Sequence, residues 1–181
     1  MKVYSKSIRI FLGISFEKNN LFTITDKQAH YLINVMRVKI GSEILVFNSF
    51  EGEYRVEIVN KSNNKITCQV RGKVRDQDDE PKLNLIFSLV KKDRVFNILE
   101  KCTELGVTCF YPILTERTQN FNYNIQKFES YVIEASEQTR RLSIPKIMPV
   151  QKINSLLNNW NKNEKILLCN ENDGIPLMKI S

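Results

Sequence analysis

The sequence has little of several residues that common classes of protein need. Histidine occurs once among 181 residues, at His30, so a Ser-His-Asp or Cys-His mechanism would depend wholly on that side chain. Six glycines and five prolines exclude collagen and low-complexity chains rich in these residues. No run approaches the roughly 18 apolar residues that a membrane span needs. Ser, Arg and Gly interrupt the first apolar run, which does not fit a signal peptide.

Common nucleotide, metal and hydrolase motifs are absent as well. Neither G-x-G-x-x-G nor G-x-x-x-x-G-K-[ST] occurs, and H-E-x-x-H and G-x-S-x-G are also missing. No C-x-x-C pair is formed by the four cysteines, which are Cys68, Cys102, Cys109 and Cys169. We therefore expect no metal, and four free thiols in the reducing cytoplasm.

Charge gives the first positive indication of function. Lys and Arg number 27 against 20 Asp and Glu, so the net charge is +7. Both halves of the chain are mildly basic, and no basic tail accounts for the excess. This balance is typical of proteins with a polyanion partner, most often nucleic acid. Many basic proteins bind no nucleic acid, so charge alone does not decide the function.

The pattern of residues 1–78 predicts a small β-barrel. A capping box at Thr25 and Gln28 predicts the start of a helix over 29–36. Turn residues separate the strand-like runs, as in hairpins. The runs are 7–12, 43–48, 53–60 and 65–74. Several short, closely spaced strands favour a barrel.

The pattern changes after an acidic connector at 76–80, which Pro81 follows. We place a domain boundary there, with a solvated hairpin loop as the alternative. Residues 82–181 then alternate predicted strands with predicted helices, which favours a parallel α/β layout. The expected strands are 82–90, 107–114 and 165–169. The expected helices begin near Asp93, which we expect as an N-cap, and near Phe128 and Ser155. Three strands with an open edge make this half look unfinished.

Charged residues gather where the parallel strands are expected to end, and sites form beyond the carboxyl ends of such strands. Each could be a solvated surface charge, but their convergence on one sheet edge indicates a site. These residues are Lys91, Lys92, Arg94, Glu116 and Arg117, together with Glu137, Gln138, Arg140 and Arg141 at the end of the following helix. In the first half, the candidates for phosphate contact are Arg9, Arg37, Lys39 and Arg55.

Several ordered motifs resemble the RsmE family of 16S ribosomal RNA uridine N3-methyltransferases. The resemblance covers essentially the whole chain. In the first half it is carried by His30, Met36-Arg37, Gly41, Val46-Phe-Asn and Gly52-Glu-Tyr. The more specific strings are Lys91-Lys-Asp-Arg94, Glu100-Lys-Cys-Thr-Glu-Leu-Gly-Val107, Pro112-Ile-Leu-Thr-Glu-Arg117 and Glu134-Ala-Ser-Glu-Gln138, followed by Arg141 and Ile144-Pro145.

The resemblance implies a fold and an activity. The fold is a PUA-like β-barrel for RNA recognition, residues 1–78, followed by a SPOUT α/β domain of the trefoil-knot type, residues 82–181. The activity is S-adenosylmethionine-dependent methylation of N3 of a uridine in 16S ribosomal RNA, by a cytoplasmic homodimer without membrane or metal. Such a transfer depends on positioning and on removal of the N3 proton more than on a covalent nucleophile.

The sequence departs from the family in one respect. The family's Gly-Pro-Glu-Gly-Gly-type cofactor loop and its knot would lie beyond Ser181, so the chain looks like a C-terminally truncated member without the cofactor site. We expect Glu116, Arg117, Gln138 and Arg141 on the active-site face. The expected RNA contacts are Arg9, Arg37, Lys39, Lys91, Lys92 and Arg94. Two alternatives remain: a non-catalytic RNA-binding fragment, and a SPOUT methyltransferase that acts on another RNA.

Overall fold

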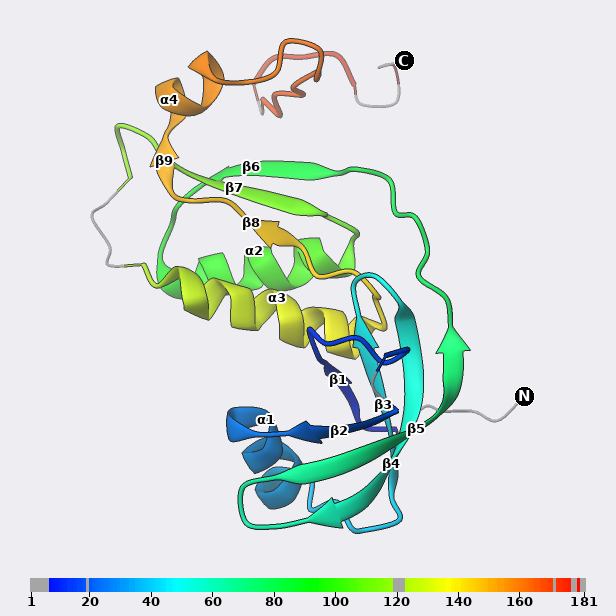
Figure 1. Ribbon diagram of the computed structural model, residues 1–181. Coiled ribbons are helices and arrows are strands. Elements are labelled where there is room, and N and C mark those ends of the chain that lie inside the picture. Colours follow the sequence, from blue (N-terminus) through cyan, green and yellow to red (C-terminus); the bar gives the residue numbers. More distant parts are fainter. Residues whose placement is uncertain (1–6, 19, 119–122, 171, 177–178, 180–181) are drawn as a thin grey trace.

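The computed structural model describes residues 7–18, 20–118, 123–170, 172–176 and 179. The first half folds around a five-stranded sheet in the order β1-β3-β4-β5-β2 (Figure 1). Its elements are β1 (Arg9–Phe11), β2 (Leu21–Ile24), helix α1 (Asp26–His30), the π-helix η1 (Tyr31–Val35), β3 (Glu43–Asn48), β4 (Gly52–Lys61) and β5 (Ile66–Arg75). Strand β1 runs parallel to β3, and the other pairs are antiparallel.

Alternating apolar residues explain why β3, β4 and β5 form one curved sheet. Ile44 pairs with Val56 and Ile58 pairs with Cys68, and all four side chains are at most 1% exposed. Because successive residues of a strand point to opposite faces, this pattern puts one face into the core. Leu32 of η1 packs into the same core. The strand expectations for 43–48, 53–60 and 65–74 are therefore confirmed to within two residues.

A tight turn joins β3 to β4. The Asn48 Oδ1 atom accepts hydrogen bonds from the backbone N–H groups of Phe50 and Glu51, at 3.2 and 2.6 Å. Gly52 then adopts a φ of 103°, a conformation that favours glycine. A Cβ atom at this position would lie 2.2 Å from the Arg75 carbonyl oxygen. The close approach of β5 therefore requires glycine here.

Two details of the first half differ from the sequence expectations. The capping box is not formed, because the Thr25 hydroxyl donates to Asp26 and the Gln28 side chain donates to the Phe11 carbonyl at 2.6 Å. The helix expected over 29–36 is a short α1 that continues as the π-helix η1. Strand β2, which pairs with β5, was not expected at all, because its four residues give too short an alternating pattern.

The second half is a parallel sheet with two long helices on one face (Figure 1). Strand β7 is central, with β6 on one side and the short β8 and β9 on the other. Phe87, Phe110, Val95, Leu99 and Val132 form its core with neighbouring apolar residues. The elements are β6 (Asn84–Ser88), α2 (Lys92–Glu104), β7 (Cys109–Leu114), α3 (Ile125–Thr139), β8 (Lys146–Ile147), β9 (Gln151–Lys152) and α4 (Ile153–Asn158).

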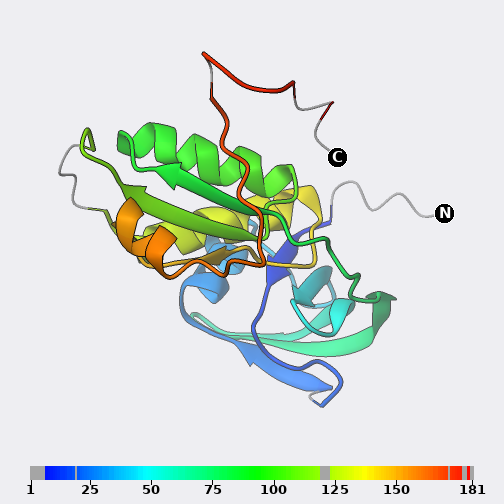
Figure 2. The same cartoon turned by 90° about the horizontal axis from the view of Figure 1, so that it is seen from above.

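The strand expected at 165–169 is wrong. This segment has no regular structure, and Leu168 is 82% exposed. Strands β8 and β9 pair with β7 on the side opposite to β6, and residues 165–169 pair with none of these strands. Seen from above, the segment extends over the sheet, on the side away from α3 (Figure 2). Among the described residues, no helix is both long and apolar enough to span a membrane.

Candidate functional site

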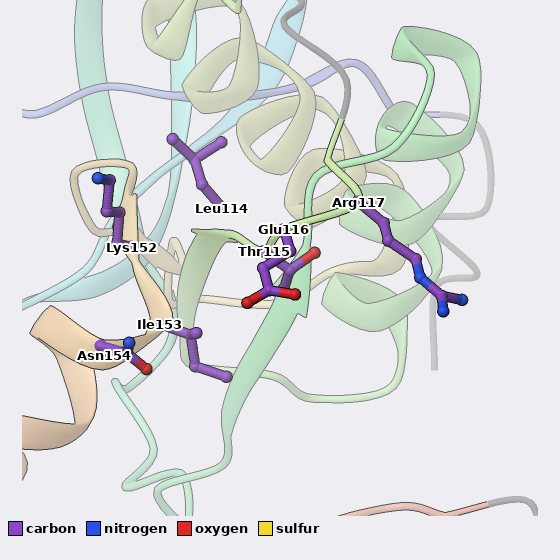
Figure 3. Close-up of a pocket in the computed structure, with 7 residues that line it drawn as sticks. All are labelled: Leu114, Thr115, Glu116, Arg117, Lys152, Ile153 and Asn154. Atoms are coloured by element: carbon purple, nitrogen blue, oxygen red, sulfur yellow. The ribbon is translucent and has the colours of Figure 1, made fainter.

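A cavity of about 580 Å³ lies beyond the carboxyl ends of β7 and β9. This is where a parallel α/β sheet places its ligands. Figure 3 shows Thr115 and Glu116 at the end of β7, Ile153 near them, and Arg117 extending away. The lining residues are Leu114, Thr115, Glu116, Arg117, Lys152, Ile153 and Asn154. The expected pair Glu116 and Arg117 therefore lies at this sheet edge, joined by Lys152, which the sequence expectations did not include.

Three hydroxyl groups hold the loop that carries Glu116 and Arg117. The Thr118 Oγ1 atom accepts from the backbone N–H of Thr115 at 2.9 Å and lies 3.0 Å from the Thr115 hydroxyl. Ser88, at the end of β6, lies 3.1 Å from the same Thr118 atom. The carboxyl ends of β6 and β7 are thus joined through side chains. The sequence predicts a turn at residues 115–118, because Thr-x-x-Thr follows a buried strand, but it does not predict the contact with Ser88.

The cations expected after β6 lie at the beginning of α2. Lys91 is the N-cap residue, in place of the expected Asp93, which lies in the first turn and forms no side-chain cap. Lys91, Lys92 and Arg94 are exposed. The N-terminus of a helix carries partial positive charge, which adds to the charge of these side chains. This edge of the sheet is therefore suited to anionic ligands.

Arg9 does not face solvent, and its expected phosphate contact is wrong. Its side chain is 5% exposed, its Nε atom donates to the Glu53 carboxylate at 2.5 Å, and its guanidinium lies 3.6 Å from the centre of the Phe47 ring. The two Nη atoms donate to carbonyl groups at the end of α3, those of Ser136, Glu137 and Arg141, at 2.7 to 3.2 Å. Arg9 therefore caps a helix of the second half from the first half, and burial lowers its pKa despite Glu53.

The Arg141 side chain is only 9% exposed and is occupied by protein groups, so its expected place on the active-site face is wrong. Its Nη1 atom donates to the carbonyl groups of Thr103 and Val107 at 2.7 and 2.8 Å. Its Nη2 atom donates to the carboxylate of Glu80 and to Ser143. Arg141 therefore fastens the acidic connector to the end of α2. An arginine that follows a helix can bind a ligand or donate to the carbonyl groups at the end of a helix. The sequence alone does not distinguish these two roles.

Glu137 and Gln138 lie on α3 beside the first half. They are away from the cavity at the carboxyl ends of β7 and β9, which we call the β7 cavity. The Glu137 carboxylate accepts the backbone N–H of Phe11 at 2.8 Å. Burial raises its pKa, although this hydrogen bond and Arg9 act in the opposite direction. Gln138 is exposed and lines a second cavity, between α3 and the first half, and not the cavity of Glu116 and Arg117. The structure therefore does not bring the four expected active-site residues together.

Comparisons with known proteins identify the family. A family model described as an RNA methyltransferase domain matches residues 78–181, which is more than half of the chain. A second, described as an RNA methyltransferase PUA domain, matches residues 24–71. The chain belongs to this RNA methyltransferase family.

Similar proteins support this assignment. A ribosomal RNA small subunit methyltransferase E from Rickettsia conorii is 26% identical over 166 residues, which are 91% of this chain and 67% of that protein. A protein of the same name from Synechocystis is 32% identical over 128 residues, 69% of this chain and 42% of that protein. The chain thus spans 42% to 67% of the length of these two relatives. The RsmE resemblance is confirmed.

Solved structures agree with the fold of this RNA methyltransferase family member. A ribosomal RNA small subunit methyltransferase E from Neisseria gonorrhoeae, bound to S-adenosyl methionine, aligns with a TM-score of 0.88 at 22% identity over 97% of this chain and 75% of that chain. A predicted RNA methyltransferase from Thermotoga maritima aligns with a TM-score of 0.68 at 24% identity, covering 80% of this chain and 66% of that chain. The expected fold, a PUA-like domain followed by an α/β domain with a parallel sheet, is confirmed.

The remaining charged candidates in the PUA-like domain are at its surface. Arg37 and Lys39 are exposed, and Arg37 adopts a φ of 53°, which is uncommon for a residue with a side chain. Arg55 lies 3.8 Å from Glu43 and is only half-exposed. Arg37 and Lys39 therefore remain available for an anionic ligand. In the part of the chain that the structure describes, no group of three His, Cys, Asp or Glu side chains could hold a metal ion.

Proposed function

We propose that this RNA methyltransferase family member acts on 16S ribosomal RNA, with S-adenosylmethionine as methyl donor and N3 of a uridine as acceptor. The observation that carries the proposal is the cavity at the carboxyl ends of β7 and β9, in a chain of this family. In the proposed division of labour, residues 1–78 recognise RNA and residues 82–181 form the methyltransferase domain. The proposed partners are the small ribosomal subunit and a second copy of the chain, in the cytoplasm.

The residues of the β7 cavity suit RNA better than they suit the cofactor. Arg117 and Lys152 are cations, with Glu116 as the one carboxylate among the lining residues. Cations attract RNA phosphates and repel a positively charged sulfonium. No glycine-rich cofactor loop occurs in residues 1–181. These residues alone therefore do not fit S-adenosylmethionine, and we assign them to the RNA.

We assign two roles within this cavity. In this proposal, the Glu116 carboxylate accepts a hydrogen bond from a uridine N3–H and is the acceptor of that proton. Arg117, which extends away from Glu116 (Figure 3), contacts a phosphate of the same strand. The Ser88–Thr115–Thr118 hydroxyl cluster fixes the loop that carries both side chains, which supplies the positioning that methyl transfer needs.

The test is the methylation state of ribosomal RNA in cells. A strain without the gene is expected to lack N3-methyluridine at one position of 16S ribosomal RNA and to regain it when the gene is restored. Glu116→Gln is expected to lower the rate of restoration about 100-fold, the usual effect of losing a general base. Glu129→Gln, on the exposed side of α3, is the matched control and should restore methylation fully. Unchanged N3-methyluridine in the strain without the gene would contradict the proposal.

The cationic lining of the cavity favours a second candidate, an RNA-binding protein without transferase activity. A radiolabelled methyl donor distinguishes the two. Label that enters 16S ribosomal RNA supports the enzyme, and label that enters another RNA supports a related methyltransferase. RNA binding without any transfer of label supports the binding protein.

A further inference from the structure

A second cavity, of about 750 Å³, lies between the PUA-like domain and α3. We name it the interdomain cavity. One wall comes from the α1–η1 segment and presents Lys27, Gln28, Tyr31 and Met36. The opposite wall comes from α3 and presents Glu134 and Gln138. The two walls combine an aromatic ring with amide and carboxylate groups, the groups that contact the face and the edge of a nucleobase.

The α1–η1 segment and the residues that follow it, 36–40, hold large apolar side chains in solvent. Tyr31, Val35, Met36 and Ile40 are 43%, 59%, 38% and 61% exposed. Exposed apolar groups concentrated on one segment are a common mark of a binding surface. Cations are close to them along the chain: Lys27 precedes Tyr31, and Arg37 and Lys39 lie between Met36 and Ile40. Aromatic and apolar groups interleaved with cations are typical of surfaces that bind single-stranded nucleic acid.

The backbone of this segment is held in two uncommon conformations. Residues Tyr31–Val35 form a π-helix, and Arg37 follows with a φ of 53°. π-helical turns are often found at functional sites, and a positive φ at a residue with a side chain costs free energy. The core holds the segment in place through Ala29, Leu32 and Val38, which are at most 4% exposed. The packing thus maintains a strained backbone that presents Tyr31 and Met36 at the cavity.

We propose that the interdomain cavity binds an unpaired base of an RNA strand. The base stacks on Tyr31, with its edge against Gln138 and Glu134, while Lys27, Arg37 and Lys39 contact the neighbouring phosphates. Charges of both signs line the cavity: the Glu134 carboxylate can accept from a base N–H or amino group, and Lys27 can contact a phosphate, while Arg37 and Lys39 are exposed close by along the chain. This inference rests on the proposed function, and it adds an RNA site separate from the β7 cavity.

The experiment measures the binding of two RNA probes, a 12-nucleotide single strand with one 2-aminopurine and the same sequence as a duplex. The single strand is expected to bind more tightly, with quenched 2-aminopurine fluorescence because the base stacks. Tyr31→Ala is expected to lower the affinity about 10-fold and to remove the quenching, whereas Tyr31→Phe keeps both. Phe50→Ala is the matched control, because Phe50 is another exposed aromatic residue on the same domain and does not line the cavity.

Salt dependence separates the base contact from the phosphate contacts. Arg37→Gln is expected to reduce the slope of log affinity against log salt by about 0.7, the value for one phosphate of a single strand. Tyr31→Ala should leave that slope unchanged. Equal effects of Tyr31→Ala and Phe50→Ala, or equal affinity for duplex and single strand, would overturn the interdomain site and leave the proposed methyltransferase standing. Normal binding of the single strand with methylation absent would overturn the proposed function and leave this site standing.

Discussion

The Arg9 side chain contacts four acceptors: Glu53 on its own domain, two carbonyl groups in the last turn of α3, and the carbonyl group of Arg141 just beyond that helix. The carbonyl groups at the end of a helix carry partial negative charge. The Arg9 guanidinium lies between these carbonyl groups and the Glu53 carboxylate, so each of its hydrogen bonds is strengthened by charge. The sequence predicts that Arg9 lies in a strand. It does not predict the contact with the carbonyl group of Ser136, which is 127 residues later in the chain.

Replacement of Arg9 should lower the free energy of unfolding and leave the salt dependence of RNA binding unchanged. Arg9→Met leaves the Glu53 carboxylate buried without its partner, and we expect the free energy of unfolding in urea to fall by about 3 kcal/mol. Lys39→Met, at an exposed position, should change it by less than about 0.5 kcal/mol. The salt slope of RNA binding should fall for Lys39→Met only. Equal losses of stability in the two variants would contradict the capping role of Arg9.

Glu137 should make stability depend on pH in a defined direction. Burial raises its pKa, helped by Glu134 and opposed by Arg9 and the Phe11 amide. The folded protein therefore binds a proton at pH values where the unfolded chain has lost it, and stability falls as pH rises from the ordinary carboxyl pKa through the raised one. Glu137→Gln keeps an acceptor for Phe11, and its unfolding free energy should fall less between pH 4.5 and 7. An identical pH profile for Glu137→Gln and the parent would contradict this.

The site residues show what a sequence can and cannot give. Glu116 and Arg117 were predictable, because they follow a buried parallel strand and such strands end at one sheet edge. Gln138 was expected at the same edge, but it lines the other cavity, beside the first domain. The residues at the end of a helix do not indicate which neighbouring element they face. Ser88 was missed, because single serines are common and its partner Thr118 becomes a neighbour only through the pairing of β6 with β7.

Strands and helices with a long repeating pattern were predictable, and short ones were not. The ten-residue strands β4 and β5 and the helix α3 follow clear periods of hydrophobicity. The π-helix η1 has no sequence signature, because its apolar residues fit an ordinary helix equally well. Residues 165–169 have the composition of a strand but form none, because composition does not say whether a segment comes to lie beside a strand with which it can pair.

The β3–β4 turn gives a sharp test at the level of these elements. Gly52→Ala combines a φ of 103° with a Cβ contact of 2.2 Å to a strand carbonyl, so we expect the free energy of unfolding to fall by about 2 kcal/mol or more. Gly13→Ala is the matched control, since no atom lies within 4 Å of a Cβ at that position. Thermal unfolding measures both. A Gly52→Ala protein as stable as Gly13→Ala would show that β5 can move away from the turn.

In the molecule as a whole, the two sheets differ in how firmly they are hydrogen-bonded. The PUA-like sheet includes two ten-residue strands, whereas the parallel sheet ends in the two-residue strands β8 and β9. Amide protons of β8 and β9 are therefore expected to exchange faster than those of β4 and β5, because fewer bonds must break to expose them. Hydrogen exchange followed by mass spectrometry measures this. Equal or slower exchange in β8 and β9 would contradict it.

Residues 1–181 by themselves are expected to bind S-adenosylmethionine weakly. The β7 cavity carries two cations, Arg117 and Lys152, against the one carboxylate of Glu116, which disfavours a sulfonium. Titration calorimetry should give no saturation at micromolar cofactor, and the double variant Arg117→Gln, Lys152→Gln should bind no more weakly than the parent. Micromolar binding by the parent chain would show that the cofactor site lies within these residues.

The Arg9 contacts have a consequence for the acidic connector. Because Arg9 fixes the end of α3 to the PUA-like domain, and Arg141 holds Glu80, the stretch between Arg75 and Glu80 need not determine how the domains are arranged. Extra residues between Asp78 and Asp79, both exposed, would lengthen a loop whose ends are already pinned, and each doubling of loop length costs only about 0.6 kcal/mol. The connector is thus a suitable point for inserting a peptide tag, because such an insertion leaves Arg9 and its contacts in place.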